Sequence, residues 1–189
     1  MFGGETLDFE IRPNPSPVSA SERDALMVNP GFGRVFTDHM VTIRYADGKG
    51  WYDARVEARA PIPMDPATAV LHYAQEIFEG LKAYRAADGG ITMFRPDANA
   101  RRFRDSAARM GMAQLPEEVF LDSLRHLITI DRAWVPTEPD SSLYLRQETD
   151  VVLPDGRVAS ASAYFYNAPL GRASRIRSGD YLEHVKARG

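Results

Sequence analysis

Cysteine is absent from this sequence, which excludes a disulfide framework and a thiolate metal site, and no other metal site is predicted. Lysine is scarce: Lys49, Lys82 and Lys186 are the only ones, whereas arginine is plentiful. Any chemistry that needs a neutral amine must therefore use one of these three lysines or a lysine from outside this chain.

Long apolar runs and a strong net charge are missing as well. No apolar stretch approaches the roughly 20 residues that span a bilayer, and the N-terminus lacks the basic and apolar segments of a signal peptide. The net charge of −3 is too mild to create the basic field that drives nucleic-acid binding. We therefore expect a cytoplasmic protein with no nucleic-acid and no membrane partner.

What is present is the composition of an ordinary globular protein, with 44% apolar and 26% charged residues over 189 positions. Two hairpins are predicted around turns rich in aspartate and glycine, one over 41–58 and one over 81–95. Further strands are predicted at 141–147, 150–153 and 158–166, the last two as another hairpin.

Four helices are predicted between the strands. A short one covers 21–26, and the next runs from Asp65, whose carboxylate suits a helix N-cap, to Gly80. The third helix begins after Pro96, and the fourth covers 116–133. The expected apolar positions of the three longer helices are Val70, Tyr73, Ala74, Ile77 and Phe78; Ala100, Phe103, Ala107 and Met110; and Phe120, Leu124, Leu127 and Ile128. This order predicts an α+β fold, with the helices on one face of a largely antiparallel sheet.

Four ordered stretches carry a resemblance to a known family. They are 29–40 (NPGFG, then TDHM), 71–85 (LHYAQEIFEGLKAYR), 94–102 (FRP, with Asn99 and Arg102) and 142–146 (SLYLR). Together they resemble the fold-type-IV pyridoxal-phosphate enzymes, specifically the N-terminal small domain of the branched-chain amino-acid aminotransferases. The match is strong through residue 146. We therefore divide the chain into an N-terminal arm (1–30), the small domain (31–146) and a diverged or truncated tail (147–189).

The resemblance implies an enzyme that transfers the amino group of leucine, isoleucine or valine to 2-oxoglutarate through pyridoxal 5'-phosphate. It also implies a homodimer and a role in amino-acid biosynthesis. Arg102 is matched to the cofactor phosphate, which a guanidinium can bind through two hydrogen bonds; a solvated helix arginine is the alternative. Phe78 and Tyr73 match aromatic residues of the substrate pocket, with Tyr73 reaching into the partner subunit, although both also suit a helix core.

Tyr144 and Arg146 lie two apart on a predicted strand and therefore share one face. The resemblance gives them a role in holding both substrates, because one pocket must accept an apolar and then an acidic side chain; an exposed edge pair is the alternative. The segment around Tyr164 (AYF) resembles a further family motif, Gly-Ala-Tyr-Phe, so Tyr164 is a candidate substrate residue. It comes earlier than the family pattern requires, and Gln147 replaces the usual proline.

The catalytic lysine of this family forms a Schiff base with the cofactor and then moves the proton, and no lysine here matches it. Lys49 lies in a predicted turn, and Lys82 lies in a motif whose lysine is not the catalytic one. Lys186 comes too early and lacks the expected surroundings. We therefore expect an incomplete chain, without the large domain and inactive by itself.

Two alternatives stay open. Within the same fold, D-amino-acid aminotransferases and aminodeoxychorismate lyases resemble the small domain but lack the long N-terminal arm. The second alternative is a non-catalytic small domain that associates with a full-length partner or with itself. Such a domain would expose an apolar patch.

Overall fold

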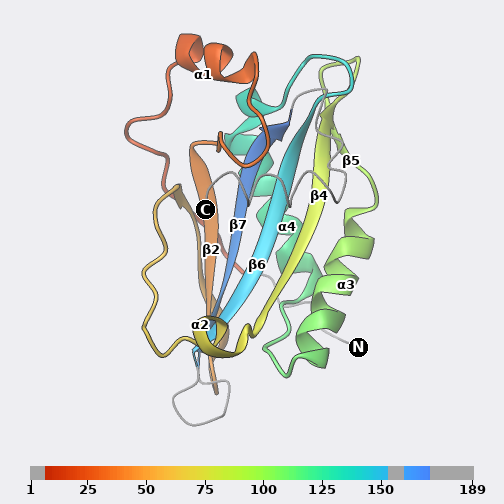
Figure 1. Ribbon diagram of the computed structural model, residues 1–189. Coiled ribbons are helices and arrows are strands. Elements are labelled where there is room, and N and C mark those ends of the chain that lie inside the picture. Colours follow the sequence, from red (N-terminus) through yellow and green to blue (C-terminus); the bar gives the residue numbers. More distant parts are fainter. Residues whose placement is uncertain (1–6, 153–159, 171–189) are drawn as a thin grey trace.

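The computed structural model describes residues 7–152 and 160–170, which build one twisted sheet with helices packed on it (Figure 1). The strands of the sheet follow the order β1-β3-β2-β7-β6-β4-β5. Their bounds are β1 (Glu10–Ile11), β2 (His39–Ala46), β3 (Gly50–Ala58), β4 (Glu76–Arg85), β5 (Ile91–Met93), β6 (Ser142–Val152) and β7 (Ser160–Leu170). Neighbouring strands are antiparallel except β1, which runs parallel to β3. The predicted α+β class with a largely antiparallel sheet is confirmed.

Two long helices cover one face, the back face of the sheet as it is viewed in Figure 1. The helices are α1 (Ala20–Met27), α2 (Ala69–Tyr73), α3 (Pro96–Arg109) and α4 (Glu117–Ile130), and a 3-10 turn covers Arg132–Trp134. Phe120 of α4 joins the layers, because its ring lies 5.4 Å from that of Phe103 in α3 and 5.5 Å from that of Phe165 in β7. All three rings are buried, so the predicted apolar faces of these two helices point into the core. Met110 is the exception: it caps the C-terminus of α3 and is 41% exposed.

The predicted helix from Asp65 to Gly80 is wrong. Helix α2 ends after one turn because Ala74 adopts the left-handed conformation (φ 50°), and β4 begins two residues later. Spacing of three and four residues among apolar positions suggested a helix, but pairing with β6 imposes alternation instead. Ile77 is buried against the back face, whereas Phe78 is 58% exposed on the opposite, front face. Phe78 is therefore a strand residue and not part of a helix core.

Strand β4 is an edge strand over most of its length. Its partner β5 pairs with only the last three residues, Ala83–Arg85. Over 76–82, β4 pairs with β6 on one side and has no strand on the other within the described residues. Helix α3 lies beside this free edge in Figure 1, so side chains of α3 can reach around it.

Strand β6 continues through residue 146 to Val152 and pairs along its whole length with β7. The predicted hairpin between these two segments is confirmed, and β7 lies in the middle of the sheet, between β2 and β6. The boundaries proposed at residues 30 and 146 stay predictions. In the described ranges, no helix has the length and apolarity needed to cross a membrane.

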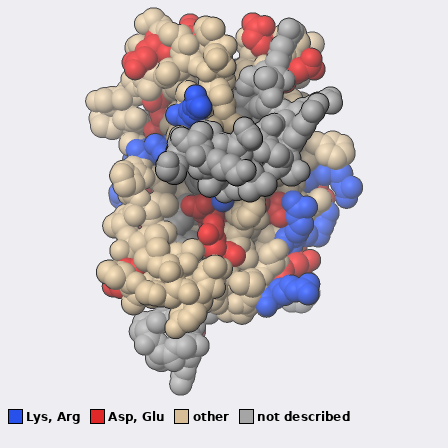
Figure 2. Space-filling model, viewed as in Figure 1, with Lys and Arg blue, Asp and Glu red and all other residues tan. Residues whose placement is uncertain are grey.

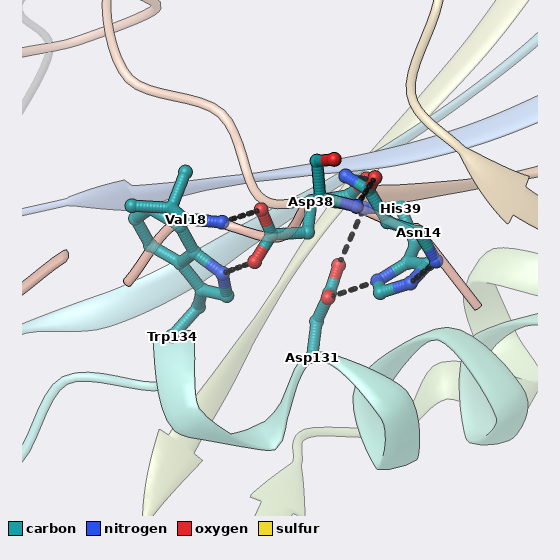
Figure 3. A network of polar contacts seen from close by, with 7 residues as sticks. Asn14, Val18, Asp38, His39, Asp131 and Trp134 are labelled. Atoms are coloured by element: carbon teal, nitrogen blue, oxygen red, sulfur yellow. Dashed lines mark hydrogen bonds and ion pairs between the residues drawn. The ribbon is translucent and has the colours of Figure 1, made fainter. Parts of the chain in front are cut away.

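The N-terminal arm is fixed to the sheet by a buried polar network (Figure 3). Asp38 accepts hydrogen bonds from the backbone N–H of Val18 at 2.8 Å and from Trp134 Nε1 at 2.7 Å. The backbone N–H of Asn14 donates to His39 Nε2 at 2.8 Å, so Nε2 is the acceptor nitrogen of that ring. The other nitrogen, Nδ1, therefore carries the proton and donates to Asp131 at 2.6 Å. This network holds the arm, the start of β2 and the end of α4 together.

A second buried polar group has no such partners. Gln147 on β6 is 0% exposed, and neither its Oε1 nor its Nε2 has a hydrogen-bond partner in the described part of the chain. We expect Gln147→Leu to stabilise the protein by about 1 kcal/mol, because it removes a desolvated amide and keeps most of the volume. Urea unfolding measures this, with the exposed Gln114→Leu as a control near zero. A loss of stability in Gln147→Leu would show that the amide is bonded in solution.

Candidate active site

The front face of the sheet brings three of the predicted site residues together, Phe78, Tyr144 and Arg146. Gly80 on β4 lies opposite Arg146 on β6, and Phe78 lies two residues before it on the same face. Tyr144 lies two residues before Arg146, so its side chain also points to the front. The prediction that Tyr144 and Arg146 share a face is confirmed, and the structure places them beside Phe78.

Tyr144 lies over Gly80 because only a glycine leaves room for it. A Cβ atom built on Gly80 would lie 2.3 Å from Tyr144 Oη and 2.9 Å from Cζ, both far inside van der Waals contact. On its other side, the Tyr144 ring lies 5.9 Å from that of Phe32, at an interplanar angle of 59°. The glycine lies within strand β4 and is therefore a packing requirement for the tyrosine, not the turn at which a helix ends.

Phe32 was not identified as a site residue from the sequence. It is bracketed by Gly31 and Gly33, both with φ of +65°, a conformation that glycine adopts readily. These two residues let the loop place one aromatic ring, 37% exposed, against Tyr144. A single aromatic between two glycines, within the NPGFG motif, was the available signal.

The described groups around Arg146 interact only weakly with its guanidinium. Its guanidinium carbon lies 4.5 Å from the centre of the Phe78 ring, which is a cation–π contact. Its nitrogens lie 3.5 Å from a Glu148 oxygen and 4.0 Å from a Glu76 oxygen. Both distances are too long for strong hydrogen bonds. Within the described residues, Arg146 can therefore turn toward another acceptor without giving up a tight ion pair.

Burial raises the pKa of the Tyr144 phenol above its usual 10.0, and this effect exceeds the opposing influence of Arg146. We expect Tyr144 to be among the last tyrosines to ionise in an alkaline titration followed at 295 nm. Because the folded-state pKa is raised, stability is retained below pH 10 and falls as the pH rises through the folded-state value. The difference between wild type and Tyr144→Phe isolates this step, and a step at or below pH 10 would contradict the expectation.

Arg102 lies in a different setting, on the back face. Its Nε and Nη2 donate to the two oxygens of Glu79, the second bond at 2.7 Å. Asn99, one turn earlier on α3, also donates to Glu79 at 2.8 Å. Glu79 is 3% exposed, whereas the Arg102 side chain is 68% exposed. The hydrogen bonds that Arg102 donates to the Glu79 carboxylate raise the pKa of Arg102, so the guanidinium stays charged.

The two groups of residues meet at the free edge of β4. Phe78, Glu79 and Gly80 are consecutive, so Glu79 points to the back while its two neighbours point to the front. A ligand that contacts both Arg102 and Tyr144 must therefore bend around this edge. Figure 2 shows basic side chains gathered at the margin beside α3, with acidic side chains next to them and further acidic side chains near the centre of the view.

The remaining candidates lie apart or outside the described side chains. Tyr73 on α2 is 81% exposed, and its ring lies 6.2 Å from that of His72, so the predicted core position is wrong. The backbone of Tyr164 pairs with Glu148, in the same row across the sheet as Phe78; its side chain lies outside the described residues. Lys82 pairs with Tyr144 across the strands, and Lys186 lies outside the described residues.

A groove of about 290 Å³ lies between β5 and α4, lined among others by Met93 and Arg132, and it includes none of the predicted site residues. Among the described residues, no group of three or more histidine, aspartate and glutamate side chains is arranged to hold a metal ion. The candidate site is the group of side chains at the β4 edge.

Fold and site together define an α+β domain with an aromatic and cationic site on the free edge of an antiparallel sheet. No family model matches the chain. It is 52% identical over 142 residues to a probable branched-chain-amino-acid aminotransferase of Streptomyces coelicolor, covering 75% of this chain and 39% of that protein. It is 49% identical over 162 residues to the branched-chain-amino-acid aminotransferase of Mycobacterium tuberculosis H37Rv, covering 85% and 44%.

The predicted resemblance to the branched-chain amino-acid aminotransferases is confirmed by these relatives. Among solved structures, the branched-chain amino acid aminotransferase of Escherichia coli is similar at 20% identity with a TM-score of 0.49, covering 68% of this chain and 40% of that one. The chain spans less than half the length of the curated relatives named above.

Proposed function

We propose that this chain provides part of the active site of a branched-chain amino-acid transaminase. The reaction moves the amino group of leucine, isoleucine or valine to 2-oxoglutarate through pyridoxal 5'-phosphate. The observation that carries the proposal is the identity of about half over 142 and 162 residues to proteins with this name. The front-face grouping of Phe78, Tyr144 and Arg146 supports it.

The cofactor, when bound, supplies the electron sink for the reaction. Arg102 fits its phosphate, because the guanidinium is exposed, permanently charged and held in one orientation by Glu79. The half-exposed aromatic surface of Phe78, Phe32 and Tyr144 fits a branched aliphatic side chain and excludes water from it.

Arg146 fits the requirement that one site accept two substrates. With an aliphatic side chain bound, the guanidinium rests on Phe78 and between two glutamates. With 2-oxoglutarate bound, its distal carboxylate competes with those glutamates for the same guanidinium. In this proposal Tyr164 adds to the same row of the sheet, and Tyr73, exposed on α2, enters the site of a partner subunit in a homodimer.

Cofactor binding by the 189-residue chain tests this proposal. We expect pyridoxal 5'-phosphate to bind, and Arg102→Ala to weaken that binding. Borohydride reduction and mass mapping of any pyridoxyl-lysine then show whether a Schiff base forms. Once the chain is joined to the part of the enzyme that supplies the catalytic lysine, the rate with L-leucine and 2-oxoglutarate, compared with the rate with D-alanine, separates this activity from that of a D-amino-acid aminotransferase. No cofactor binding by the folded chain, or a preference for D-alanine, would overturn the proposal.

The exposed side chains of α2 favour a second candidate function, a non-catalytic domain that associates with another copy of itself. Leu71 is 58% and Tyr73 is 81% exposed on this single-turn helix, so two large apolar side chains face solvent there. Sedimentation of wild type and of a Leu71→Ser, Tyr73→Ser variant tests it. A wild-type monomer at high concentration would exclude this candidate.

A further inference from the structure

We infer that Glu79 is a positioning residue that selects which edge of the Arg102 guanidinium meets an anion. The inference rests on the proposed function, in which that anion is the cofactor phosphate. It concerns a residue that lies between two site residues in the sequence and yet points to the other face of the sheet.

A guanidinium offers two edges for paired hydrogen bonds, one formed by Nε and Nη2 and the other by Nη1 and Nη2. Glu79 occupies the first edge: Nε donates to Oε1, and Nη2 donates to Oε2. Neither contact uses Nη1. An incoming phosphate must therefore approach the end of the guanidinium, through Nη1 and the second hydrogen of Nη2.

Glu79 is itself held firmly, which is why it can orient a side chain as mobile as arginine. It is nearly completely buried, and its backbone lies in the ladder between β4 and β6. Asn99 donates to Oε2, so that oxygen receives two hydrogen bonds. If Arg102 turned away, a buried carboxylate would lose its paired donors, which is costly. The pair therefore differs from a surface ion pair, in which both side chains move freely.

The negative charge of Glu79 also weakens the field that an anion feels at Arg102. Glu79 therefore fixes the direction from which an anion approaches Arg102, but it weakens the attraction between the anion and Arg102. Arg102 without Glu79 would be a solvated helix arginine, and an anion would have to order its long side chain on binding. Orientation, and not added charge, is what Glu79 contributes.

Phosphate titration of the 189-residue chain with ¹⁵N-labelled arginine tests the inference, using inorganic phosphate and pyridoxal 5'-phosphate as probes. In wild type, we expect phosphate to shift the Nη signals of Arg102 and leave its Nε–H signal sharp. Glu79→Asp keeps the charge but is too short to reach. It should broaden the Nε–H signal and weaken phosphate binding about three- to tenfold, the cost of ordering one long side chain.

The matched control is Glu117→Asp. It shortens the acid that pairs with Arg104, which lies on α3 as Arg102 does, and it should leave phosphate binding unchanged. Asn99→Ala keeps both Glu79 and Arg102 and should weaken binding less than Glu79→Asp, so it serves if Glu79→Asp does not fold. Loss of binding in Arg102→Ala, with wild-type binding and a sharp Nε–H signal in Glu79→Asp, would overturn the inference alone. Unchanged binding in Arg102→Ala would overturn the proposed phosphate contact and the inference with it.

Discussion

Asp131→Ala is expected to destabilise the protein by about 2–5 kcal/mol, because each buried donor left without an acceptor costs about 1–3 kcal/mol. Asp131 is 2% exposed and accepts two hydrogen bonds from His39, one from Nδ1 at 2.6 Å and one from the backbone N–H at 3.2 Å. Alanine leaves both donors buried without partners. Urea unfolding followed by circular dichroism measures the loss of free energy.

The control is Asp122→Ala on the same helix, which removes a carboxylate paired with Arg125 at the surface. An exposed pair of this kind contributes at most about 1 kcal/mol. The difference between the two variants therefore separates burial from helix charge. If Asp131→Ala lost no more than Asp122→Ala, the network of Figure 3 would not contribute to stability.

Limited proteolysis adds a local readout of the same network. His39 binds Asp131 with one nitrogen and the backbone of Asn14 with the other, so loosening the histidine frees the arm as well. We expect new cleavage near residues 14–18 in Asp131→Ala before the sheet itself is cut. The same segment leads toward the loop of Phe32, so loosening it also disturbs the front-face site.

The parts of the fold that the sequence predicted are those in which one periodicity dominates. The faces of α3 and α4 follow helical spacing alone, and Tyr144 and Arg146 alternate with the buried residues Leu143, Leu145 and Gln147 along β6. In the segment 69–85 two patterns overlap. Spacing there suits a helix as well as a strand, and only pairing with β6, far along the chain, decides between them.

The site shows the same limit. Phe78, Tyr144 and Arg146 were identified because they lie within recognisable motifs, and the structure brings them together. Glu79 was missed although it lies in the same motif as Phe78. Its role depends on Arg102, 23 residues away on another element, and no local pattern records that contact. The sequence shows the residue types, but it does not show which helices and strands contact each other.

Gly80→Ala is expected to displace Tyr144 and to destabilise the protein by about 1–3 kcal/mol, the range for inserting a methyl group into a filled space. The added Cβ would lie 2.3 Å from Tyr144 Oη and 3.0 Å from a ring carbon, so the whole ring must move and not only its hydroxyl. Because Phe32 packs on that ring, its contact with Tyr144 is lost as well.

A double-mutant cycle with Tyr144→Ala identifies the cause. If the clash is with the tyrosine, Gly80→Ala should cost little in the Tyr144→Ala background, which gives a coupling of about 1–2 kcal/mol. Gly90→Ala is the matched control, since its added Cβ would meet only an exposed aspartate side chain, Asp88. Additive losses would mean that Gly80 is required for its backbone. A coupled loss would mean that the glycine exists to seat Tyr144 beside Arg146, where the proposed substrate binds.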